Sequence, residues 1–263
     1  MTLFHAFVLG LVQGFTEFLP ISSDGHLVVV GLFFSRAFDG KAALGFDIML
    51  HSASLCALLL LYARTWWELL RAPFVGDRTH TWILFLLFLT VIPGSIVGLL
   101  SRDLVAGVLR SETAAGVGFF VTAMVLLFVD GRGVRDSRSD HILSMPKALF
   151  LGVAQAVAIL PGVSRSGLTI SAGRLCGLTR RQALDFSFLM AVPIIVGAIF
   201  VTMLEWAEGN FVLPAFSVSF VGFASSFVAS VLAIMTLRRW IARFSLAWFA
   251  LYLIPLSVFL LYF

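Results

Sequence analysis

Long uninterrupted apolar blocks constrain this chain more than any other feature. A helix that crosses the hydrocarbon core of a bilayer needs about 20 predominantly apolar residues. A membrane β-barrel would instead alternate apolar and polar residues over segments of about 10 residues. The blocks here are continuous, so we predict an all-α polytopic membrane protein. Its six transmembrane helices are expected at about 45–62, 81–100, 114–129, 184–204, 214–236 and 245–263.

Composition and charge agree with this prediction. Of the 263 residues, 60% are hydrophobic and 12% are charged, whereas a soluble domain carries about 25% charged residues. The formal net charge of +4 arises from basic residues that lie mostly between the apolar blocks. Basic residues in such loops orient a chain in the membrane, so we expect no nucleic acid partner. Cys56 and Cys176 match no metal or redox spacing.

Two apolar regions are interrupted and do not fit simple spans. Residues 3–34 are broken around Pro20, and residues 148–173 are broken around Pro161. Because proline ends or kinks a helix, each region is expected to form two short helices that meet at a polar break. Such a re-entrant hairpin is tolerated at membrane depth only where protein or a watery cavity surrounds it.

The two interrupted regions resemble each other. We interpret the chain as one membrane domain, 1–263, built from the repeats 1–130 and 147–263. Each repeat holds one hairpin and three spans, and because three is odd the second repeat is inverted. The hairpins then enter from opposite faces and meet near the midplane, where such folds bind their ligands. An offset of 142 residues aligns Leu9, Gly10, Gln13, Ser22 and Gly25 with Leu151, Gly152, Gln155, Ser164 and Gly167.

Basic residues predict which side each loop faces. Cytoplasmic loops carry an excess of Lys and Arg, so the side with more of them is expected to be cytoplasmic. Both termini and the first hairpin then lie on the outer side. This orientation requires that both hairpins return, and it changes if either one spans. One side receives Arg64, Arg71, Arg78, Arg132, Arg135, Arg138, Lys147, Arg174, Arg180, Arg181, Arg238, Arg239 and Arg243, and the other receives Arg36, Lys41, Arg102 and Arg110.

Four ionisable residues lie inside the hairpins and need compensation. A charged side chain at the centre of a bilayer costs about 2.5–3.5 kcal/mol on insertion scales. Glu17, Asp24, His26 and Arg165 are therefore expected to meet around a polar cavity or a ligand.

Gln13 and Glu17 are four residues apart, so they would share one face of a helix. Their amide and carboxylate oxygens are suitable ligands for a divalent cation. The alternative is a helix face that only packs against polar neighbours. Asp47 and His51 have the same spacing near the start of a span, and we interpret them as a structural pair.

The residues after Pro20 suit phosphate chemistry. Ser22 and Ser23 are favourable N-cap residues, and the N-terminus of a helix attracts anions. His26 follows Ser23 by three residues and could share its face. It could serve as a base for a serine nucleophile, attack phosphorus itself or protonate the leaving group. The alternative is that the serines only cap the helix and that the histidine is a satisfied buried residue.

The second break, residues 161–167, is the more specific motif. Pro161 and the glycine after it favour a turn whose successive N–H groups can bind an anion. Arg165 adds a permanent charge and a planar fork that matches phosphate oxygens. Ser164, Ser166 and Thr169 add hydroxyl groups. The alternative is a structural arginine that pairs with Glu17.

These residues resemble those of a known family. Residues 13–27 read Gln-Gly-Phe-Thr-Glu-Phe-Leu-Pro-Ile-Ser-Ser-Asp-Gly-His-Leu. They are similar to the first signature of the undecaprenyl-diphosphate phosphatases, the bacitracin-resistance family. That signature has Glu or Gln, three residues, then Glu, followed by Pro-x-Ser-Ser-x-Gly-His. Residues 161–167, with Thr169, resemble the second signature of the family, and the similarity covers essentially the whole chain.

The resemblance implies hydrolysis of undecaprenyl diphosphate to undecaprenyl phosphate and inorganic phosphate. This reaction recycles the lipid carrier of cell-wall synthesis and confers bacitracin resistance. The resemblance also implies a divalent cation, Mg²⁺ or Ca²⁺, and an active site that faces the periplasm from the bacterial inner membrane. The expected partners are a polyprenyl diphosphate, the bilayer and, in a homodimer, a second copy of the chain.

Residue by residue, the resemblance assigns Glu17 to catalysis or metal binding. It assigns Ser23 or His26 to phosphoryl attack and acid–base work, and Ser164 and Arg165 to binding of the diphosphate. Which of Ser23 and His26 attacks is left open.

One position, Asp24, departs from the common pattern of the family, and one related family is disfavoured. Gln13 is the permitted alternative to Glu, so the metal site would carry one charge fewer, and Asp24 stands where Thr is common. Type-2 phosphatidic acid phosphatases also pair a Pro-Ser-Gly-His motif with a Ser-Arg motif. Theirs needs a second His five residues after that Arg, and none stands there after Arg165.

The sequence is also compatible with a second class of function. Inverted repeats with broken helices near the midplane are also a transporter architecture. The same polar groups could bind and move a phosphorylated lipid without cleaving it. A lipid transporter or flippase is therefore the alternative to the phosphatase.

Overall fold

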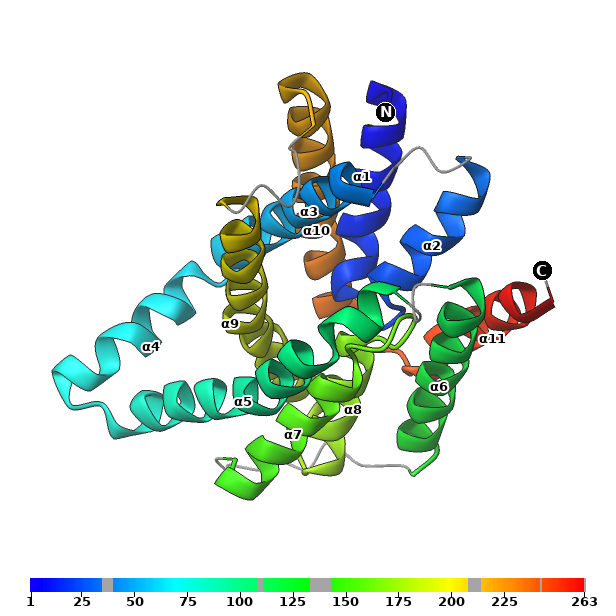
Figure 1. Ribbon diagram of the computed structural model, residues 1–263. Coiled ribbons are helices and arrows are strands. Elements are labelled where there is room, and N and C mark those ends of the chain that lie inside the picture. Colours follow the sequence, from blue (N-terminus) through cyan, green and yellow to red (C-terminus); the bar gives the residue numbers. More distant parts are fainter. Residues whose placement is uncertain (35–39, 108–110, 133–142, 208–213, 242, 263) are drawn as a thin grey trace.

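A computed structural model describes residues 1–34, 40–107, 111–132, 143–207, 214–241 and 243–262. Within these ranges the chain is built from helices and contains no strand (Figure 1), as predicted. The helices in chain order are α1 (Leu3–Phe18), α2 (Ser23–Phe33), α3 (Gly40–Leu61), α4 (Ala63–Val75), α5 (Arg78–Gly107), α6 (Glu112–Gly131), α7 (Met145–Val157), α8 (Arg165–Leu175), α9 (Arg180–Ala207), α10 (Phe216–Trp240) and α11 (Ala247–Tyr262).

The described helices that are long and apolar enough to cross a membrane are fewer than the six spans predicted. α5, α6, α9 and α10 meet this requirement. α3 meets it only together with α4, to which it is bent by 75°. α11 has 16 residues, or about 24 Å of helix, which is short of a hydrocarbon core of about 30 Å. Length and composition thus support four spans, or five if α3 and α4 form one broken span.

Both interrupted regions fold as two short helices around a break. α1 and α2 are separated by residues 19–22, and α7 and α8 by residues 158–164. Pro20 and Pro161 lie in these breaks, where neither can disturb a helical hydrogen bond. A serine caps the N-terminus of each second helix, because the Ser22 and Ser164 hydroxyls accept bonds from the N–H groups three residues ahead.

The two hairpins occupy corresponding positions. An offset of 142 carries the bounds of α2 onto those of α8. α1 packs along α10, and α7 packs along α5. In both pairs an aligned glycine permits close approach, since a Cβ at Gly10 would lie 2.5 Å from the Gly222 carbonyl oxygen and one at Gly152 2.8 Å from that of Thr90. In Figure 1 α1 runs downward and α7 upward, as an inverted repeat requires. The repeat itself stays a prediction.

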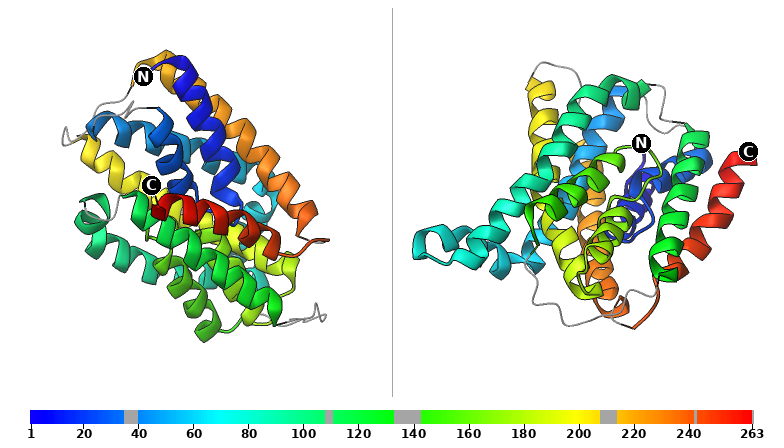
Figure 2. Two further views of the ribbon diagram at one scale, coloured as in Figure 1. Left: turned by 90° about the vertical axis from the view of Figure 1, so that its right-hand side faces the viewer. Right: turned by 90° about the horizontal axis from the view of Figure 1, so that it is seen from below.

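α6 and α11 lie side by side in both views of Figure 2. α6 also contacts α2 and α8, the second helices of the two hairpins. A Cβ at Gly118 of α6 would lie 2.1 Å from the Pro161 carbonyl oxygen. The break of the second hairpin is therefore pressed against α6, which helps to hold both hairpins in place.

Two residues assigned to the cytoplasmic side hold helix ends together. Lys147 donates to the Cys176 carbonyl oxygen at 2.8 Å, and Arg180 donates to that of Phe244 at 2.9 Å. These bonds join the starts of α7 and α9 to the segments that follow α8 and α10. Arg36, Arg110, Arg135 and Arg138 lie outside the described residues, as do the side chains of Lys41 and Arg102.

Candidate active site

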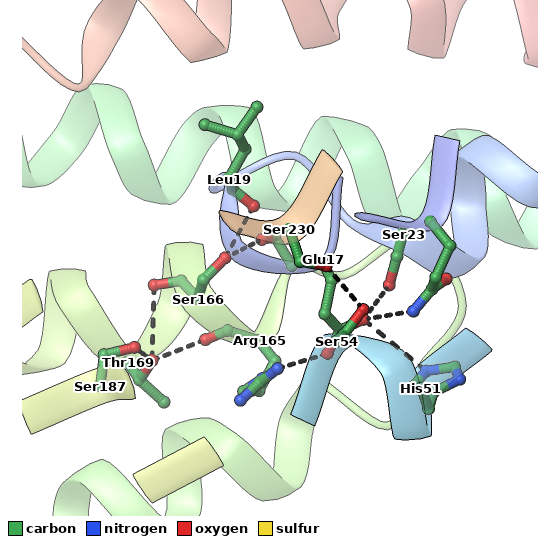
Figure 3. Close-up of polar contacts among 12 residues, drawn as sticks. Glu17, Leu19, Ser23, His51, Ser54, Arg165, Ser166, Thr169, Ser187 and Ser230 are labelled. Carbon is green, nitrogen blue, oxygen red and sulfur yellow. Dashed lines mark hydrogen bonds and ion pairs between the residues drawn. The ribbon is translucent and has the colours of Figure 1, made fainter. Parts of the chain in front are cut away.

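The Glu17 carboxylate is the centre of the polar cluster. It lies in the last turn of α1 and is 8% exposed. One oxygen, Oε2, accepts hydrogen bonds from Gln13 Nε2 at 2.9 Å and Ser23 Oγ at 2.7 Å. The other, Oε1, accepts from Arg165 Nη2 at 2.5 Å (Figure 3). Gln13, Glu17 and Ser23 come from the first hairpin and Arg165 from the second, so the two hairpins meet at this ion pair.

A strained turn presents Ser23 to Glu17. Ser22 has φ 67° and ψ 112°, which is unusual for a residue with a side chain and costs about 1–3 kcal/mol. The Phe119 ring of α6 packs directly against this turn, since a Cβ at Gly25 would lie 2.5 Å from that ring. Ser23 is the first residue of α2, so its hydroxyl projects where the unpaired N–H groups of that helix begin.

The second hairpin brings Arg165 and Ser164 to the same place. Gly162 has φ +79°, and a Cβ there would lie 2.1 Å from the Ala115 carbonyl oxygen of α6. The Ser164 N–H donates to Thr122 Oγ1 at 2.9 Å, and its hydroxyl accepts from the Gly167 N–H at 3.1 Å. α6 thus fixes the break, and Arg165 begins α8 with its side chain directed to Glu17.

A cavity of about 460 Å³ lies over this cluster. Its volume is within the range of small-molecule sites, about 300–1,000 Å³. The polar wall combines acidic, basic and hydroxyl side chains, and the remaining wall is apolar apart from Thr202. The polar wall comprises Glu17, Ser22, Ser23, Asp24, Asp47, His51, Ser164 and Arg165.

The sequence is also similar to known proteins over nearly its whole length. The sequence matches the family of the bacitracin resistance protein BacA over residues 6–259. The chain belongs to this family. The undecaprenyl-diphosphatase of Desulforudis audaxviator is 39% identical over 263 residues, covering 98% of this chain and 96% of the relative. The proteins of the same name from Gemmatimonas aurantiaca and Acinetobacter baumannii are 37% and 33% identical, covering 98% and 97% of this chain and 96% and 93% of the relatives.

His51 faces the cavity of this BacA-family chain, although the sequence favoured a structural pair with Asp47. Its Nε2 lies 3.6 Å from Glu17 Oε2, and its Nδ1 lies 2.9 Å from the Asp47 carbonyl oxygen. Both residues line the cavity. The spacing of two ionisable residues by one helical turn at the start of α3 was the available signal. Because Asp47 and His51 lie far from both signatures in the sequence, their place beside Glu17 could not be predicted.

His26 does not line the cavity. Its Nδ1 lies 2.7 Å from the Ser22 carbonyl oxygen, and its Nε2 lies 2.8 Å from the Tyr252 hydroxyl oxygen. The ring stacks on Tyr252 and meets Phe119 edge-on. The sequence spacing left open whether His26 shares a face with Ser23 or is a satisfied buried histidine; residues three apart differ by about 60° around a helix. Here that difference directs the imidazole toward α6 and α11, and its role in attack stays a prediction.

Ser166 and Thr169, predicted to bind the diphosphate, make structural bonds instead of lining the cavity. The Ser166 hydroxyl donates to the Leu19 carbonyl oxygen at 2.7 Å and joins the two hairpins. Thr169 Oγ1 donates to the Arg165 carbonyl oxygen at 2.8 Å and lies 2.6 Å from Ser187 Oγ of α9. Both side chains are buried in the contacts that orient α8.

The oxygen donors near Glu17 fit a divalent cation of the Mg²⁺ or Ca²⁺ class. Gln13 Oε1 is buried and has no hydrogen-bond partner. Three carboxylates, those of Glu17, Asp24 and Asp47, line a cavity whose permanent cation is Arg165. Oxygen-rich, acidic surroundings are those that such hard cations select. No group of three or more His, Cys, Asp or Glu side chains arranged to hold a metal occurs among the described residues, so water or substrate oxygens would complete the coordination.

Proposed function

We propose that this chain is an integral membrane hydrolase that converts undecaprenyl diphosphate into undecaprenyl phosphate and inorganic phosphate. Membership of the BacA family and the names of the relatives support this activity. The observation that carries the proposal is the hydrogen bond from Ser23 to Glu17, whose other oxygen pairs with Arg165. An alcohol, its base and a phosphate-binding cation thus share one cavity. Recycling of the lipid carrier for cell-wall synthesis and bacitracin resistance follow from this activity.

The geometry favours Ser23 as the nucleophile. Its oxygen would attack the terminal phosphorus, and its proton would pass to Glu17, 2.7 Å away. The bond between that phosphorus and the bridging oxygen then breaks, and the lipid monophosphate leaves with the proton that Glu17 returns to its bridging oxygen. Water next attacks the phosphoserine, which releases inorganic phosphate and restores the hydroxyl, so the net reaction consumes one water.

Arg165 would exchange its carboxylate partner for phosphate during the reaction. Its guanidinium can bind two phosphate oxygens in parallel, and it stabilises the charge that develops on the transferring group. Ser22 and Ser164, which cap α2 and α8 at the cavity wall, would add donors from two helix N-termini.

Gln13 and Glu17 would hold the divalent cation, with oxygens of the substrate completing its shell. When bound, Mg²⁺ or Ca²⁺ supplies Lewis-acid neutralisation of phosphoryl charge. The net acidity of the cavity supports a cation, because a diphosphate would otherwise approach three carboxylates. We expect chelation by EDTA to abolish phosphate release and added Mg²⁺ or Ca²⁺ to restore it. Undiminished turnover in EDTA would remove the cation from the proposal.

We place the chain in the bacterial inner membrane with the cavity open to the periplasm. The excess of basic residues in the predicted cytoplasmic loops supports this orientation, and two of them, Lys147 and Arg180, hold neighbouring helix ends together. The inverted repeat is part of the same proposal. Association into a homodimer stays a prediction, and the reaction does not depend on it.

The test is phosphate release from farnesyl or undecaprenyl diphosphate by protein purified in detergent. Glu17→Ala and Arg165→Ala should each lose at least about 100-fold in kcat, as removal of one preorganised electrostatic group does in other enzymes. Arg64→Ala is the matched control, since Arg64 pairs with Glu68 on the surface. Robust turnover by Glu17→Ala or Arg165→Ala would refute these roles.

A lipid transporter or flippase remains the second candidate, because two broken hairpins meet beside a cavity. The names of the relatives favour the hydrolase. Lipid translocation in liposomes that survives His26→Ala, with no phosphate released by the unaltered protein, would favour the transporter.

A further inference from the structure

The His26 side chain is held at both of its ring nitrogens, away from the cavity. Its Nδ1 lies 2.7 Å from the Ser22 carbonyl oxygen. Because a carbonyl oxygen only accepts hydrogen bonds, Nδ1 carries a proton and is the donor. In the neutral ring Nε2 then keeps its lone pair and accepts from the Tyr252 hydroxyl at 2.8 Å. The imidazole therefore links the Tyr252 hydroxyl to the Ser22 carbonyl.

Two aromatic rings fix the plane of this imidazole. Tyr252 of α11 stacks on it with 5.7 Å between ring centroids and an interplanar angle of 12°. Phe119 of α6 meets it edge-on at 5.1 Å. His26 is 7% exposed, so the ring has little freedom to turn. The direction of its Nδ1–H bond thus depends on α6 and α11, which pack along each other.

The carbonyl that accepts from His26 belongs to the strained residue of the first hairpin. Ser22 has φ 67° and ψ 112°, outside the regions that a residue with a side chain ordinarily adopts. The backbone N–H of His26 also donates to this carbonyl, but at 3.4 Å, so the ring nitrogen is the closer of these two donors. Strain of this kind persists only where the surrounding structure imposes it, and the imidazole is one such support.

The same carbonyl determines where Ser23 lies. A peptide bond is planar, so the Ser22 carbonyl oxygen, the Ser23 nitrogen and the Ser23 Cα move as one rigid group. Rotation of this group would swing the Ser23 side chain away from Glu17, whose Oε2 lies 2.7 Å from Ser23 Oγ. A fixed Ser22 carbonyl therefore holds the Ser23 hydroxyl in its hydrogen bond.

We propose that Tyr252 is a positioning residue for phosphoryl transfer. Through His26 it holds the Ser22 carbonyl and thereby keeps the Ser23 hydroxyl against Glu17. The inference rests on the proposed function for the attack by Ser23. It gives a task in the reaction to α11, none of whose described residues lines the cavity. It also makes His26 a link between Tyr252 and the turn.

Tyr252→Phe tests the link, with Tyr262→Phe as the matched control on the same helix. The measured quantity is the rate constant of the first turnover of farnesyl diphosphate, with enzyme in excess and rapid acid quenching. A smaller folded fraction lowers the amplitude of this phase but not its rate constant. A misplacement of about 1 Å can cost about 100-fold in rate, and because Phe119 still supports the turn we expect Tyr252→Phe to lower the rate constant about tenfold.

The control should behave differently. Tyr262 is exposed near the end of α11, so Tyr262→Phe should change the rate constant by less than about twofold, as surface substitutions do. An unchanged rate constant in Tyr252→Phe, or equal losses in both variants, would overturn the inference.

Substitutions of His26 separate the link from acid–base catalysis. The Asn amide nitrogen can occupy the place of Nδ1 and donate to the Ser22 carbonyl, whereas the longer Gln side chain places its amide near Nε2. We therefore expect the rate constant of His26→Asn to exceed that of His26→Gln by about tenfold. In the His26→Asn protein, Tyr252→Phe should have a further effect of less than about twofold, because the two residues act through one contact. Equal rate constants in the Asn and Gln variants, or a full effect of Tyr252→Phe in both backgrounds, would overturn the inference.

Hydrogen–deuterium exchange keeps the link testable apart from catalysis. The peptide that contains residues 19–28 should exchange faster in Tyr252→Phe than in the unaltered protein, whereas the peptide that contains α8 should not change. Equal acceleration in both peptides would indicate general loosening and overturn the inference. Faster exchange in 19–28 alone, with no phosphate released by the unaltered protein, would leave the link in place and refute the hydrolase. Phosphate release with unchanged exchange in Tyr252→Phe would refute the link alone.

Discussion

Glu17 is the residue on which the site depends. It accepts hydrogen bonds from three side chains, two from its own hairpin and one from the opposite hairpin. A buried carboxylate is tolerated only with such partners. The sequence identified the need for compensation, and one of its two interpretations of Arg165 was a pair with Glu17, which is the pairing found here. Sequence could not predict the direction of His26, because the Tyr252 hydroxyl that holds it comes from α11, 226 residues away along the chain.

Arg165→Ala should destabilise the protein because it leaves the Glu17 charge buried without its cation. Removal of one partner of a buried ion pair costs about 3–5 kcal/mol. Adding Glu17→Gln to Arg165→Ala should restore part of that loss without restoring phosphate release. Thermal unfolding in detergent measures both variants against Arg64→Ala, whose surface ion pair is worth less than about 1 kcal/mol. Equal unfolding temperatures for the single and double variants would contradict the central position of Glu17.

Tyr252→Phe isolates the hydrogen bond that holds His26. The aromatic stack can persist in this variant, but a buried ring nitrogen loses its partner. We expect a loss of about 1–3 kcal/mol, the cost of an unsatisfied buried group. Unfolding temperature is the measurement, and Tyr262→Phe is the control, because Tyr262 lies exposed near the end of α11. No difference between the two variants would show that His26 is not held in this way.

Among the elements, the breaks of the hairpins were the most predictable and α4 the least. Pro20 and Pro161 marked the breaks, and the aligned serines marked the starts of α2 and α8. α4 was not predicted, because its mixture of Arg, Trp and Glu breaks the apolar pattern just after the 45–62 block. Its bend from α3 occurs at Tyr62, whose hydroxyl donates to Asp185 of α9 at 2.5 Å. That tertiary contact cannot be read from local sequence.

The break of the second hairpin should tolerate no side chain at Gly162. Gly162 and Gly177 both have positive φ, but a Cβ at Gly162 meets the Ala115 carbonyl oxygen at 2.1 Å, whereas one at Gly177 meets no atom within 4 Å. Gly177→Ala should therefore cost about 1 kcal/mol from backbone strain alone. Gly162→Ala should cost several times more and reduce phosphate release, because it displaces Arg165. Equal effects on unfolding temperature would show that α6 does not fix this break.

At the scale of the whole molecule, two short helical hairpins share one partner, α6, and present their polar ends to each other. The repeat predicted from the offset of 142 placed the polar ends of the two hairpins together, whereas the part played by α6 was not predicted from the sequence. The number of spans was harder to predict, since α11 is short and α3 is bent from α4. An apolar pattern does not determine where a helix bends or how it tilts.

Thiol labelling tests the orientation. Ser144→Cys places a thiol at the N-cap of α7, beside the predicted cytoplasmic loop, and Thr2→Cys places one near the N-terminus. Both positions are exposed. We expect a membrane-impermeant maleimide to label the Thr2→Cys protein in intact spheroplasts, and the Ser144→Cys protein only after lysis. Burial raises the pKa of the native Cys176 thiol, so at neutral pH less thiolate forms there and its background labelling is slow. The reverse pattern would invert the topology.

The most direct test of the central claim is rapid acid quenching of the protein during turnover of a diphosphate labelled at its terminal phosphorus. The account predicts an acid-stable phosphoserine in the peptide that contains Ser23. This label should be absent from Ser23→Ala and retained by His26→Gln. An acid-labile, alkali-stable label that survives Ser23→Ala and disappears in His26→Gln would contradict it and assign the attack to His26.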